Sequence, residues 1–489
     1  MKLFRLKKPV ALMTAAVLAA TMLTVSVSAA SAATPKTPKG FITEHDALYA
    51  QYGDAIDDLA EGLYNMEEEI ELYSYQIPSS LVGSIYETCV HTHPELFYLS
   101  ENYYYSEFTY SGDSTAYIYS YSPIYTVTAA ELAQKRALFY EKANWFLSFV
   151  SEDMSDFEKA MILHDEIILN STYVLDKDIY GIMVEGEGKC YGYALVYAYL
   201  LSQVGVRTEF VASDTMNHAW VKVCIDGEYY NVDPTWDDPT VDRPGLVGHF
   251  NFLVSDQAFQ SGSVGCDVHT DYTTDHPSPT TYDNAAFRNA GSKVCFTDYG
   301  VFMVNNQANS ANANQILSYN VSSGTVQTFK EITDRWDAGG GYVWSNTYTG
   351  LAEQDNYLYY NTPTAVYAVD LTDGSEQVFA QNTYQNQFYG VRIKGGVVYA
   401  SLSPSPDDAR TVVEVGNCLE RVQEPVLALG DANGDSIVDI CDATQIQRSI
   451  AGLEELTAAQ TLAADFNQDG VVSIDDVTMI QMYLAGFPV

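Results

Sequence analysis

The chain has 489 residues, a length typical of about three domains. It contains 64 acidic and 24 basic residues, so its formal net charge at pH 7 is −40. This excess of negative charge disfavours binding to nucleic acid and to anionic membranes, and it favours solubility and calcium binding. The seven cysteines are spread without paired spacing, so they predict no disulfide framework, and their odd number indicates at least one free thiol.

Residues 1–33 have the pattern of a secretory signal peptide. Four basic residues among the first eight precede an apolar stretch from Val10, and Ala30, Ser31 and Ala32 form a small-residue cleavage site. Because the segment holds four basic and no acidic residues, its removal would change the formal charge from −40 to −44. No second apolar stretch of about 18 residues follows. We therefore expect a secreted, extracellular protein without a membrane span.

The region from the signal peptide to residue 140 combines helical and strand patterns. Helix-like sequence covers residues 44–71, and a tyrosine-rich tract covers residues 103–125 with turn residues from Ser111 to Asp113. The alternation in this tract predicts a β-hairpin. Tyrosine-rich strands can stack on sugars, but they also make ordinary sheet faces, which we favour here. A helix over residues 131–151 then leads into the next domain, so we expect this region to be an appendage of that domain.

Three short stretches carry the residue types of a thiol enzyme. Cys190 lies in GKCYGYALVYAYLL, His218 follows 28 residues later in NHAWVKV, and Asp233 follows after a further 15 in YYNVDPTWDD. A thiol attacks as the thiolate, which needs a neighbouring imidazole, and the imidazole needs an acceptor that fixes its tautomer. The three stretches therefore predict the active site.

The local patterns predict a suitable geometry for these three residues. Glycines flank Cys190, and the apolar run over residues 194–201 predicts a buried helix whose first turn lies at or near the thiol. Unpaired amides and the positive end of the dipole in that turn lower a thiol pKa and can hold an oxyanion. Strands from His218 and over residues 229–232, joined by a tight turn, would bring His218 and Asp233 to the same end of a sheet.

These motifs resemble the transglutaminase-like superfamily, whose members share a papain-like catalytic core. The similarity extends upstream through residues 154–174 and downstream through residues 249–256, and it covers roughly residues 140–260. The resemblance implies a nucleophile, a general base and acid, and an orienting carboxylate, which are in that order Cys190, His218 and Asp233.

Other residues with chemical potential have simpler interpretations. His164 lies in an apolar helical pattern and is expected to be a packed or capping residue. His91 and His93 match a metal pair only in residue type, so we expect a packing segment there. Trp236 can either wall the site or belong to the core, and Cys224 is expected to pack inside a strand.

The chain becomes irregular and then all-β after the core. Residues 261–290 are rich in Ser, Thr, Asp, Gly and Pro and predict a linker or long loop. Beyond them, the sequences that begin at Ser318 and Ala368 repeat at an offset of 50 residues. The repeat resembles β-propeller blades, yet the region holds fewer than three of them, and closed propellers need about 4 to 8. We therefore expect a partial, propeller-like sheet region for binding or spacing.

The C-terminus contains a duplicated calcium loop. DANGDSIVDICD begins at Asp431 and DFNQDGVVSIDD begins at Asp465, 34 residues later. Side-chain oxygens at loop positions 1, 3, 5, 9 and 12 and a backbone carbonyl at position 7 are the ligands of such a loop. The predicted ligands are Asp431, Asn433, Asp435, Ile437, Asp439 and Asp442 in the first loop and Asp465, Asn467, Asp469, Val471, Ser473 and Asp476 in the second.

The two loop–helix units resemble a type I dockerin. The resemblance implies two structural calcium ions and a cohesin module of a cellulosomal scaffold as partner. Ser436 stands where glycine is common, so the turn of the first loop is expected to be slightly strained. Loop positions 10 and 11, which help to choose the cohesin, differ between the repeats and from the common Ser-Thr pair. Cys441 at one of them is either exposed or buried.

The sequence therefore predicts a multidomain secreted protein. Its expected parts are a signal peptide (1–33), an N-terminal helical and Tyr-rich β region (34–140), an α+β papain-like, transglutaminase-like core (141–260), a linker (261–290), an all-β propeller-like repeat region (291–425) and a small α-helical, calcium-binding dockerin (428–489).

Its expected function is that of a cysteine peptidase or amidase docked to a cellulosome and so associated with plant polysaccharide degradation. The same triad would serve a protein-crosslinking transglutaminase, which stays open. A non-catalytic adaptor is disfavoured by the intact triad. A glycoside hydrolase needs two opposed carboxylates, and no motif singles out such a pair.

Overall fold

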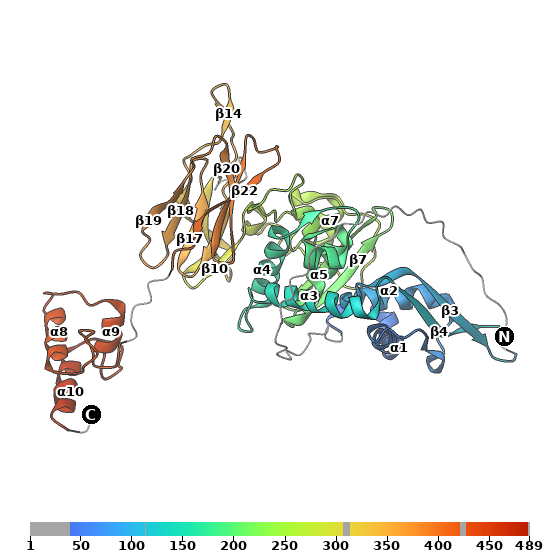
Figure 1. Cartoon of the computed structure of the whole chain (residues 1–489), viewed down its shortest axis with the longest axis horizontal. Helices are drawn as coiled ribbons and strands as arrows, with labels where there is room; N and C mark the ends of the chain where they lie inside the picture. The colour runs from blue at the N-terminus through green and yellow to red at the C-terminus, as the bar shows by residue number, and fades with distance from the viewer. Residues whose placement is uncertain (1–39, 113, 307–312, 421–426, 488–489) are drawn as a thin grey trace. The chain divides into compact units, whose positions relative to one another are not determined.

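The computed structural model describes residues 40–112, 114–306, 313–420 and 427–487 (Figure 1). The chain forms two compact units, Met1–Cys418 and Leu419–Val489. The expected signal peptide lies outside the described residues. Within the described residues, no helix has both the length and the apolar character needed to cross a membrane.

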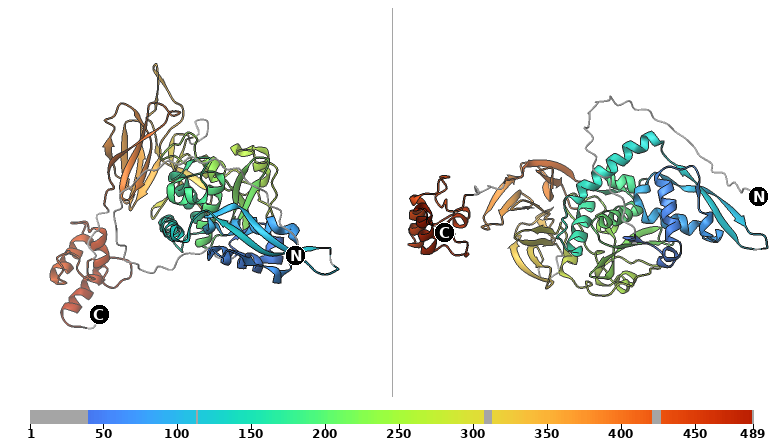
Figure 2. Two further views of the ribbon diagram at one scale, coloured as in Figure 1. Left: turned by 45° about the vertical axis from the view of Figure 1, so that its right-hand side comes forward. Right: turned by 90° about the horizontal axis from the view of Figure 1, so that it is seen from below.

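The N-terminal region is a helical layer against a three-stranded sheet of order β2-β4-β3. Its elements are β1 (Ile42–Thr43), α1 (Asp46–Tyr64), β2 (Ile70–Glu71), the 3₁₀ turns η1 (Tyr73–Tyr75) and η2 (Ser79–Leu81), α2 (Val82–Thr92), η3 (Pro94–Leu96), β3 (Leu99–Thr109) and β4 (Ala116–Tyr125). The tyrosine-rich tract forms the expected antiparallel hairpin β3–β4, a long ribbon in every view (Figures 1 and 2), although Asp113 of its turn lies outside the described residues.

The tyrosines of this ribbon differ in burial. Tyr121 is buried and stacks with Tyr86, so it builds an ordinary sheet face as expected. Tyr104 and Tyr105 are exposed. The region is fastened to the next domain by β1, which pairs in parallel with β7, Ile42 lying opposite Thr208.

The central domain surrounds one buried helix, α5. Its elements are α3 (Ala129–Leu147), α4 (Asp156–Leu169), β5 (Thr172–Tyr173), the π-helical turn η4 (Gly181–Glu185), β6 (Glu187–Gly188), α5 (Cys190–Gln203), β7 (Thr208–Ser213), β8 (His218–Ile225), β9 (Glu228–Val232), α6 (Pro234–Asp237) and α7 (Asp256–Ser261). Because α5 carries no charged side chain and is apolar or aromatic on nearly every side, it lies in the core, with α3 and α4 packed on it and the sheet β1-β7-β8-β9 on another side.

Helix capping and turn chemistry set the boundaries of these elements. Thr128 and Ser155 cap α3 and α4, each in a reciprocal capping box with the glutamate three residues later. The hairpin β8–β9 closes through Asp226 and Gly227, both with positive φ, which matches the turn expected from the sequence. The predicted helices and hairpin of the core are thus confirmed.

The linker expected over residues 261–290 is packed rather than free. The segment is largely irregular, with the short turns η5 (Ser263–Gly265) and η6 (Ala286–Asn289). However, Phe287 and Ala290 belong to the main hydrophobic core, and His269 is fully buried. The segment is therefore the long loop that the sequence allowed, and its polar composition concealed the residues that anchor it to the core.

The β region is a series of separate antiparallel meanders. Its strands are β10 (Cys295–Thr297), β11 (Gly300–Asn305), β12 (Gln315–Asn320), β13 (Thr325–Glu331), β14 (Asp337–Gly339), β15 (Tyr342–Val343), β16 (Leu351–Gln354), β17 (Tyr357–Asn361), β18 (Ala365–Asp370), β19 (Glu376–Gln381), β20 (Gln387–Lys394), β21 (Val397–Ser403) and β22 (Thr411–Asn417). The repeated sequences form the last two strands of the two four-stranded sheets, β10-β11-β12-β13 and β16-β17-β18-β19. The sheets of the described residues are open, so a propeller is not shown.

This β region is joined to α4 rather than separated from it. Val294 donates its amide to Asp165 at 2.8 Å, and Lys293 pairs with Glu166 at 2.8 Å and with Glu353 at 2.7 Å. These contacts are buried, so the β region and the catalytic domain form a continuous packed body.

The C-terminal unit consists of α8 (Ile440–Ile450), α9 (Ala458–Ala464) and α10 (Ile474–Leu484) (Figures 1 and 2). Helices α8 and α10 pack together around a small apolar cluster that includes Ile446 and Ile480. The two helices begin at equivalent positions of the duplicated loops, which explains the internal symmetry of this unit.

Candidate active site

Cys190 is the first residue of α5, as the sequence predicts. The preceding residue, Lys189, makes no side-chain cap, and its carbonyl accepts the amides of Gly192 and Tyr193. Within the described residues, the first-turn amides without an intrahelical acceptor are therefore those of Cys190 and Tyr191. The flanking glycines are required by packing: a Cβ on Gly188 would lie 2.6 Å from Ile182, and one on Gly192 would lie 2.6 Å from the Asp178 carbonyl. The thiol therefore sits where the helix begins, with close backbone packing behind it.

His218 is the first residue of β8, beside the start of α5. Its Nε2 lies 2.6 Å from Asp233 Oδ2, so the hairpin brings the histidine and the aspartate together as expected. Trp236 stacks on the imidazole with ring centroids 4.6 Å apart, and its side chain is partly exposed. Trp236 is therefore a wall of the site rather than a core residue.

Asp233 directs its two carboxylate oxygens to different partners. Oδ1 accepts hydrogen bonds from the Thr235 amide at 3.0 Å and the Trp236 amide at 3.3 Å, and so caps α6. Oδ2 faces His218 and also the Nε2 of His269, at 3.0 Å. His269 was missed by the sequence argument, because it lies in a segment whose composition indicated a linker.

The electrostatics favour a thiolate–imidazolium pair. Burial raises the pKa of the Cys190 thiol, but its hydrogen bond to His218, the histidine's charge and the Ala219 amide together hold that pKa below its ordinary value. Burial lowers the pKa of His218, but the charge of Asp233 and the hydrogen bonds to Asp233 and Cys190 raise it to about 10. Asp233 is desolvated, yet the two histidines hold its pKa well below the usual range.

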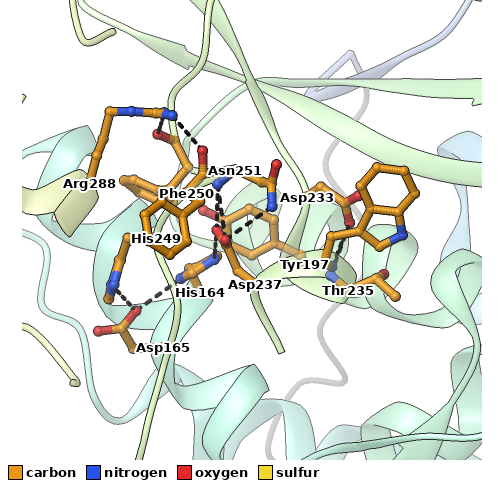
Figure 3. Close-up of polar contacts among 12 residues, drawn as sticks. His164, Asp165, Tyr197, Asp233, Thr235, Asp237, His249, Phe250, Asn251 and Arg288 are labelled. Atoms are coloured by element: carbon orange, nitrogen blue, oxygen red, sulfur yellow. Dashed lines mark hydrogen bonds and ion pairs between the residues drawn. The ribbon is translucent and has the colours of Figure 1, made fainter. Parts of the chain in front are cut away.

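A second buried network of histidines and carboxylates includes Asp237, the last residue of α6 (Figure 3). Asp165 Oδ1 is 2.9 Å from both His164 Nδ1 and His249 Nε2, and His164 Nε2 is 3.3 Å from Asp237 Oδ2. The expectation that His164 is a packed residue is confirmed, and its partners show why it is buried. This network connects α4 with α6, the short helix that Asp233 caps.

The loop that follows α6 completes this second network. Asp237 accepts the amide of Asn251 at 2.9 Å, and the carbonyl of Asn251 accepts the amide of Asp233 at 3.0 Å. Arg288 donates to the carbonyls of Phe250 and Phe252 and holds the same loop from the other side (Figure 3). Asp233 is thus fixed through its backbone as well as through its carboxylate.

Two groups of side chains in the described residues bring metal-ligand atoms within 4.8 Å of one another. They are His164, Asp165 and His249, and His218, Asp233 and His269. In both groups the ligand atoms face each other at hydrogen-bonding distance, so protons occupy the positions that a metal ion would take. His91 pairs with Glu44 and packs against Phe210, in agreement with the packing role expected for it.

All seven cysteines lie within the described residues and are free thiols. Cys224 is buried in β8, as expected, whereas Cys441 is exposed. All seven are thus reduced, and Cys190 is distinguished by its neighbouring imidazole, which lowers the pKa of its thiol.

The duplicated loops of the C-terminal unit have matching internal hydrogen bonds. Asp431 accepts the amides of loop positions 4, 5 and 6, and Asp465 accepts those of positions 5 and 6. Asp442 and Asp476 at position 12 each accept the amides of positions 3 and 9. Ser436 has φ +69°, so the strain expected in the first loop is confirmed.

The chemistry of these loops fits a hard cation. Asp431, Asp442 and Asp476 are buried, and the described loop residues include no Lys, Arg or His paired with them. Buried carboxylates without a counterion are costly, and oxygen donors are the ligands that Ca²⁺ takes. The residues present therefore suit calcium.

Comparison with known proteins finds one family match within each of the two compact units. The family model of the transglutaminase-like superfamily matches residues 143–234, which include Cys190, His218 and Asp233. The family model of the dockerin type I domain matches residues 429–485. No protein with a curated description matches the chain.

Two solved structures have limited similarity to the chain. One, from Cytophaga hutchinsonii, is assigned provisionally by its description to the cysteine proteases; it is 15% identical, with a TM-score of 0.18, over 29% of this chain and 65% of that one. The other, from Parabacteroides distasonis, is assigned provisionally to the proteases; it is 15% identical, with a TM-score of 0.15, over 30% of this chain and 38% of that one. At these scores the likeness has no bearing on activity.

Proposed function

Because the chain joins a transglutaminase-like core to a C-terminal type I dockerin, we propose that it is a secreted cysteine peptidase or amidase that docks to a cellulosome. The catalytic residues of this proposal are Cys190 as nucleophile, His218 as general base and acid, and Asp233 as the carboxylate that orients the histidine. The observation that carries it is the 2.6 Å contact between His218 and Asp233 beside a thiol of lowered pKa.

The geometry supports the following chemistry. Since Nε2 of His218 faces Asp233, Nδ1 is the ring nitrogen left for the thiol. The Cys190 thiolate attacks the amide carbonyl, and the carbonyl π electrons move to oxygen, where the free amides of the first turn of α5 stabilise the oxyanion. The oxyanion collapses, the C–N bond breaks, and His218 gives its proton to the departing amine. Water, deprotonated by His218, then attacks the thioester carbonyl. The C–S bond breaks, the acid leaves, and the Cys190 thiolate and the His218 imidazolium are restored.

The acyl-enzyme is common to hydrolysis and to transfer onto a lysine amine. The experiment therefore offers both acceptors: the wild type and Cys190→Ala are incubated with a mixed protein digest and a lysine-mimicking amine, and new ends and adducts are identified by mass spectrometry. New peptide ends that need Cys190 support hydrolysis. Amine incorporation at glutamine that needs Cys190 assigns a transglutaminase instead. If neither product forms with the digest and the amine in excess, the result favours the adaptor function.

The dockerin supplies the attachment. Each loop would hold one calcium ion through its five side chains and the carbonyl at position 7, Ile437 or Val471, and the ion would supply the positive charge around which the loop folds. A cohesin module is then the partner, and association with polysaccharide breakdown follows from the complex rather than from cleavage of sugars by this chain.

The two units can be separated experimentally. Asp431→Ala and Asp465→Ala together should abolish calcium-dependent cohesin binding, since each removes the position 1 ligand. Reaction of Cys190 with a thiol probe should be unchanged, because the catalytic domain belongs to the other compact unit. Loss of both cohesin binding and Cys190 labelling in this variant would contradict the proposal that the two units act independently.

A further inference from the structure

We propose that His269 is a positively charged fourth member of the catalytic group, a positioning residue that balances the charge of Asp233 and so sets the pH range in which Cys190 and His218 exist as an ion pair. The inference rests on the proposed function only in taking Cys190 and His218 as the reacting pair. It concerns a residue outside the matched segment 143–234.

The geometry around Asp233 accounts for both of its oxygens. Oδ1 is committed to the amides that begin α6, and Oδ2 is shared by His218 Nε2 at 2.6 Å and His269 Nε2 at 3.0 Å. Asp233 and His269 are both fully buried. Protein groups therefore supply the hydrogen bonds of both carboxylate oxygens, and two imidazoles share Oδ2.

The second ring nitrogen of His269 defines its protonation. Nδ1 lies 3.1 Å from the backbone carbonyl of Asp267, which can only accept a hydrogen bond, so Nδ1 carries a proton. Nε2 faces the carboxylate of Asp233, which also accepts. A neutral imidazole would leave one bare nitrogen against an acceptor oxygen, whereas the imidazolium satisfies both contacts.

His269 is held in this position by packing rather than by the chain alone. Its ring lies parallel to Phe259 at 3.6 Å between centroids and contacts Trp236 at 4.3 Å and Trp220 at 4.8 Å. Asp267, which carries the accepting carbonyl, is tied to Asn251 by two hydrogen bonds of 3.0 Å. The ring is therefore presented to Asp233 in a fixed orientation.

The charges that face His269 are few. The described groups packed against it are the carboxylate of Asp233, the imidazole of His218, three aromatic rings and the Asp267 carbonyl, while the Asp267 carboxylate accepts from Asn251. With His269 charged, the four members Cys190, His218, Asp233 and His269 sum to zero in the ion-pair state. Without it they sum to −1, and every proton in the group is held more tightly.

This charge has a direct consequence for catalysis. Asp233 alone would strengthen the hold of His218 on its proton, and an imidazolium that is too weak an acid cannot deliver that proton to a leaving amine. His269 offsets this pull, and it also favours the thiolate form of Cys190. The ring centroids of His218 and His269 are 5.6 Å apart. At that separation a unit charge moves a pKa by about two units with an effective dielectric constant of about 20.

The test uses two substitutions in the full-length chain. His269→Gln retains a donor near Asp233 but removes the positive charge, and His269→Phe removes both while keeping an aromatic ring against Phe259. The control is His276→Gln, which removes a histidine paired with Glu209 at 3.1 Å outside the site. Alkylation of Cys190 by iodoacetamide is followed from pH 4 to 11 by mass spectrometry of the Cys190 peptide, together with thermal unfolding.

The expected result is that both apparent pKa values of the alkylation profile move upward in His269→Gln, the higher one, which belongs mainly to His218, by about two units. The same shift is expected in His269→Phe, with a lower maximal alkylation rate, and no shift is expected in His276→Gln.

A folded His269→Gln variant with an unshifted pH profile and only a lower alkylation rate would show a structural role and overturn the inference. A downward shift would overturn it as well. Because iodoacetamide needs no substrate, shifted profiles without any turnover would refute the proposed function and leave this inference standing.

Discussion

Cys190 and His218 each occupy the first position of a secondary-structure element, the thiol at the start of α5 and the imidazole at the start of β8. Helix α5 packs on β8, so the two reactive side chains meet at one end of this helix–sheet pair. The arrangement uses the unpaired amides of a helix N-terminus on one side and a strand end on the other. The pair is therefore built from two rigid elements rather than from loops.

The pH dependence of amide hydrolysis should follow this pair. The rate should rise with a pKa below that of an ordinary cysteine, because His218 stabilises the thiolate, and fall as His218 loses its proton near pH 10. The measurement is kcat/KM from pH 4 to 11 with a peptide substrate found in the digest. A single rise near the ordinary cysteine pKa would contradict the ion pair.

Asp233→Asn should lower kcat by about 10²- to 10⁴-fold, because an amide no longer stabilises the imidazolium or fixes its tautomer. The substitution keeps an oxygen that can cap α6, so the fold should persist. Asp214→Asn, at an exposed position in the turn before β8, is the matched control and should retain full activity. Equal losses in the two variants would show a general effect of charge.

The sequence was informative where a local pattern and a chemical role coincide. Cys190, His218 and Asp233 each lie at the boundary of a strongly patterned element, and the predicted hairpin places His218 near Asp233. The packing of α5 on β8, which brings Cys190 to them, comes from the fold. His269 has no such pattern, since its sequence neighbours are Asp267, Val268, Thr270 and Asp271. Its burial depends on contacts with Phe259 and the tryptophans that only the fold creates. A single sequence offers no signal that would have separated it from loop histidines.

The β region shows a second limit of sequence reasoning. Its repeats predict the strands well, because Gly324 and Gly374 mark turns with positive φ. Its attachment to the catalytic domain could not be predicted, because the buried ion pair of Lys293 with Glu166 joins segments more than 120 residues apart. Charged residues of this kind are expected at surfaces, and only their partner explains their burial.

Asp165→Asn should reduce the free energy of unfolding by about 3–5 kcal/mol, since it removes the negative charge between two buried imidazoles and turns an NH2 group toward either an imidazole or the Val294 amide. Asp407→Asn, whose exposed carboxylate lies 3.7 Å from Arg243, should change stability by about 0–1 kcal/mol. Denaturant unfolding of both variants at pH 7 measures the difference. A small effect at Asp165 would contradict a charged network.

The same network predicts how stability changes with pH. Burial lowers the pKa of His164, but Asp165 and Asp237 raise it to about 9. The pKa of His164 is higher in the folded than in the unfolded chain, so its protonation stabilises the fold. This contribution is complete below the unfolded pKa of about 6.5 and is lost as the pH rises through the folded pKa of about 9. The unfolding free energy should therefore decline by a few kcal/mol across that window, with His218 contributing in the same direction. Stability that is flat from pH 6 to 10 would contradict this.

Ser436 and Gly470 form a reciprocal pair at position 6 of the two loops. Ser436→Gly should stabilise the calcium-loaded dockerin by about 0.5–1 kcal/mol, because φ +69° is costly for serine. Gly470→Ser should destabilise it by a similar amount; a Cβ there meets open space, so the cost is conformational alone. Calcium-dependent thermal unfolding of both variants is the measurement, and changes of the same sign in both would contradict the strain argument.

The most direct measurement for the central claim is the order in which cysteines react. The full-length chain is exposed briefly to iodoacetamide at pH 7 without denaturant, and labelled peptides are mapped by mass spectrometry. The account predicts that Cys190, only 8% exposed, is labelled ahead of the exposed Cys441, because His218 lowers the pKa of Cys190 while a hydrogen bond to Asp439 raises that of Cys441. Labelling of Cys441 first, with Cys190 left intact, would contradict the assignment of Cys190 as an activated nucleophile.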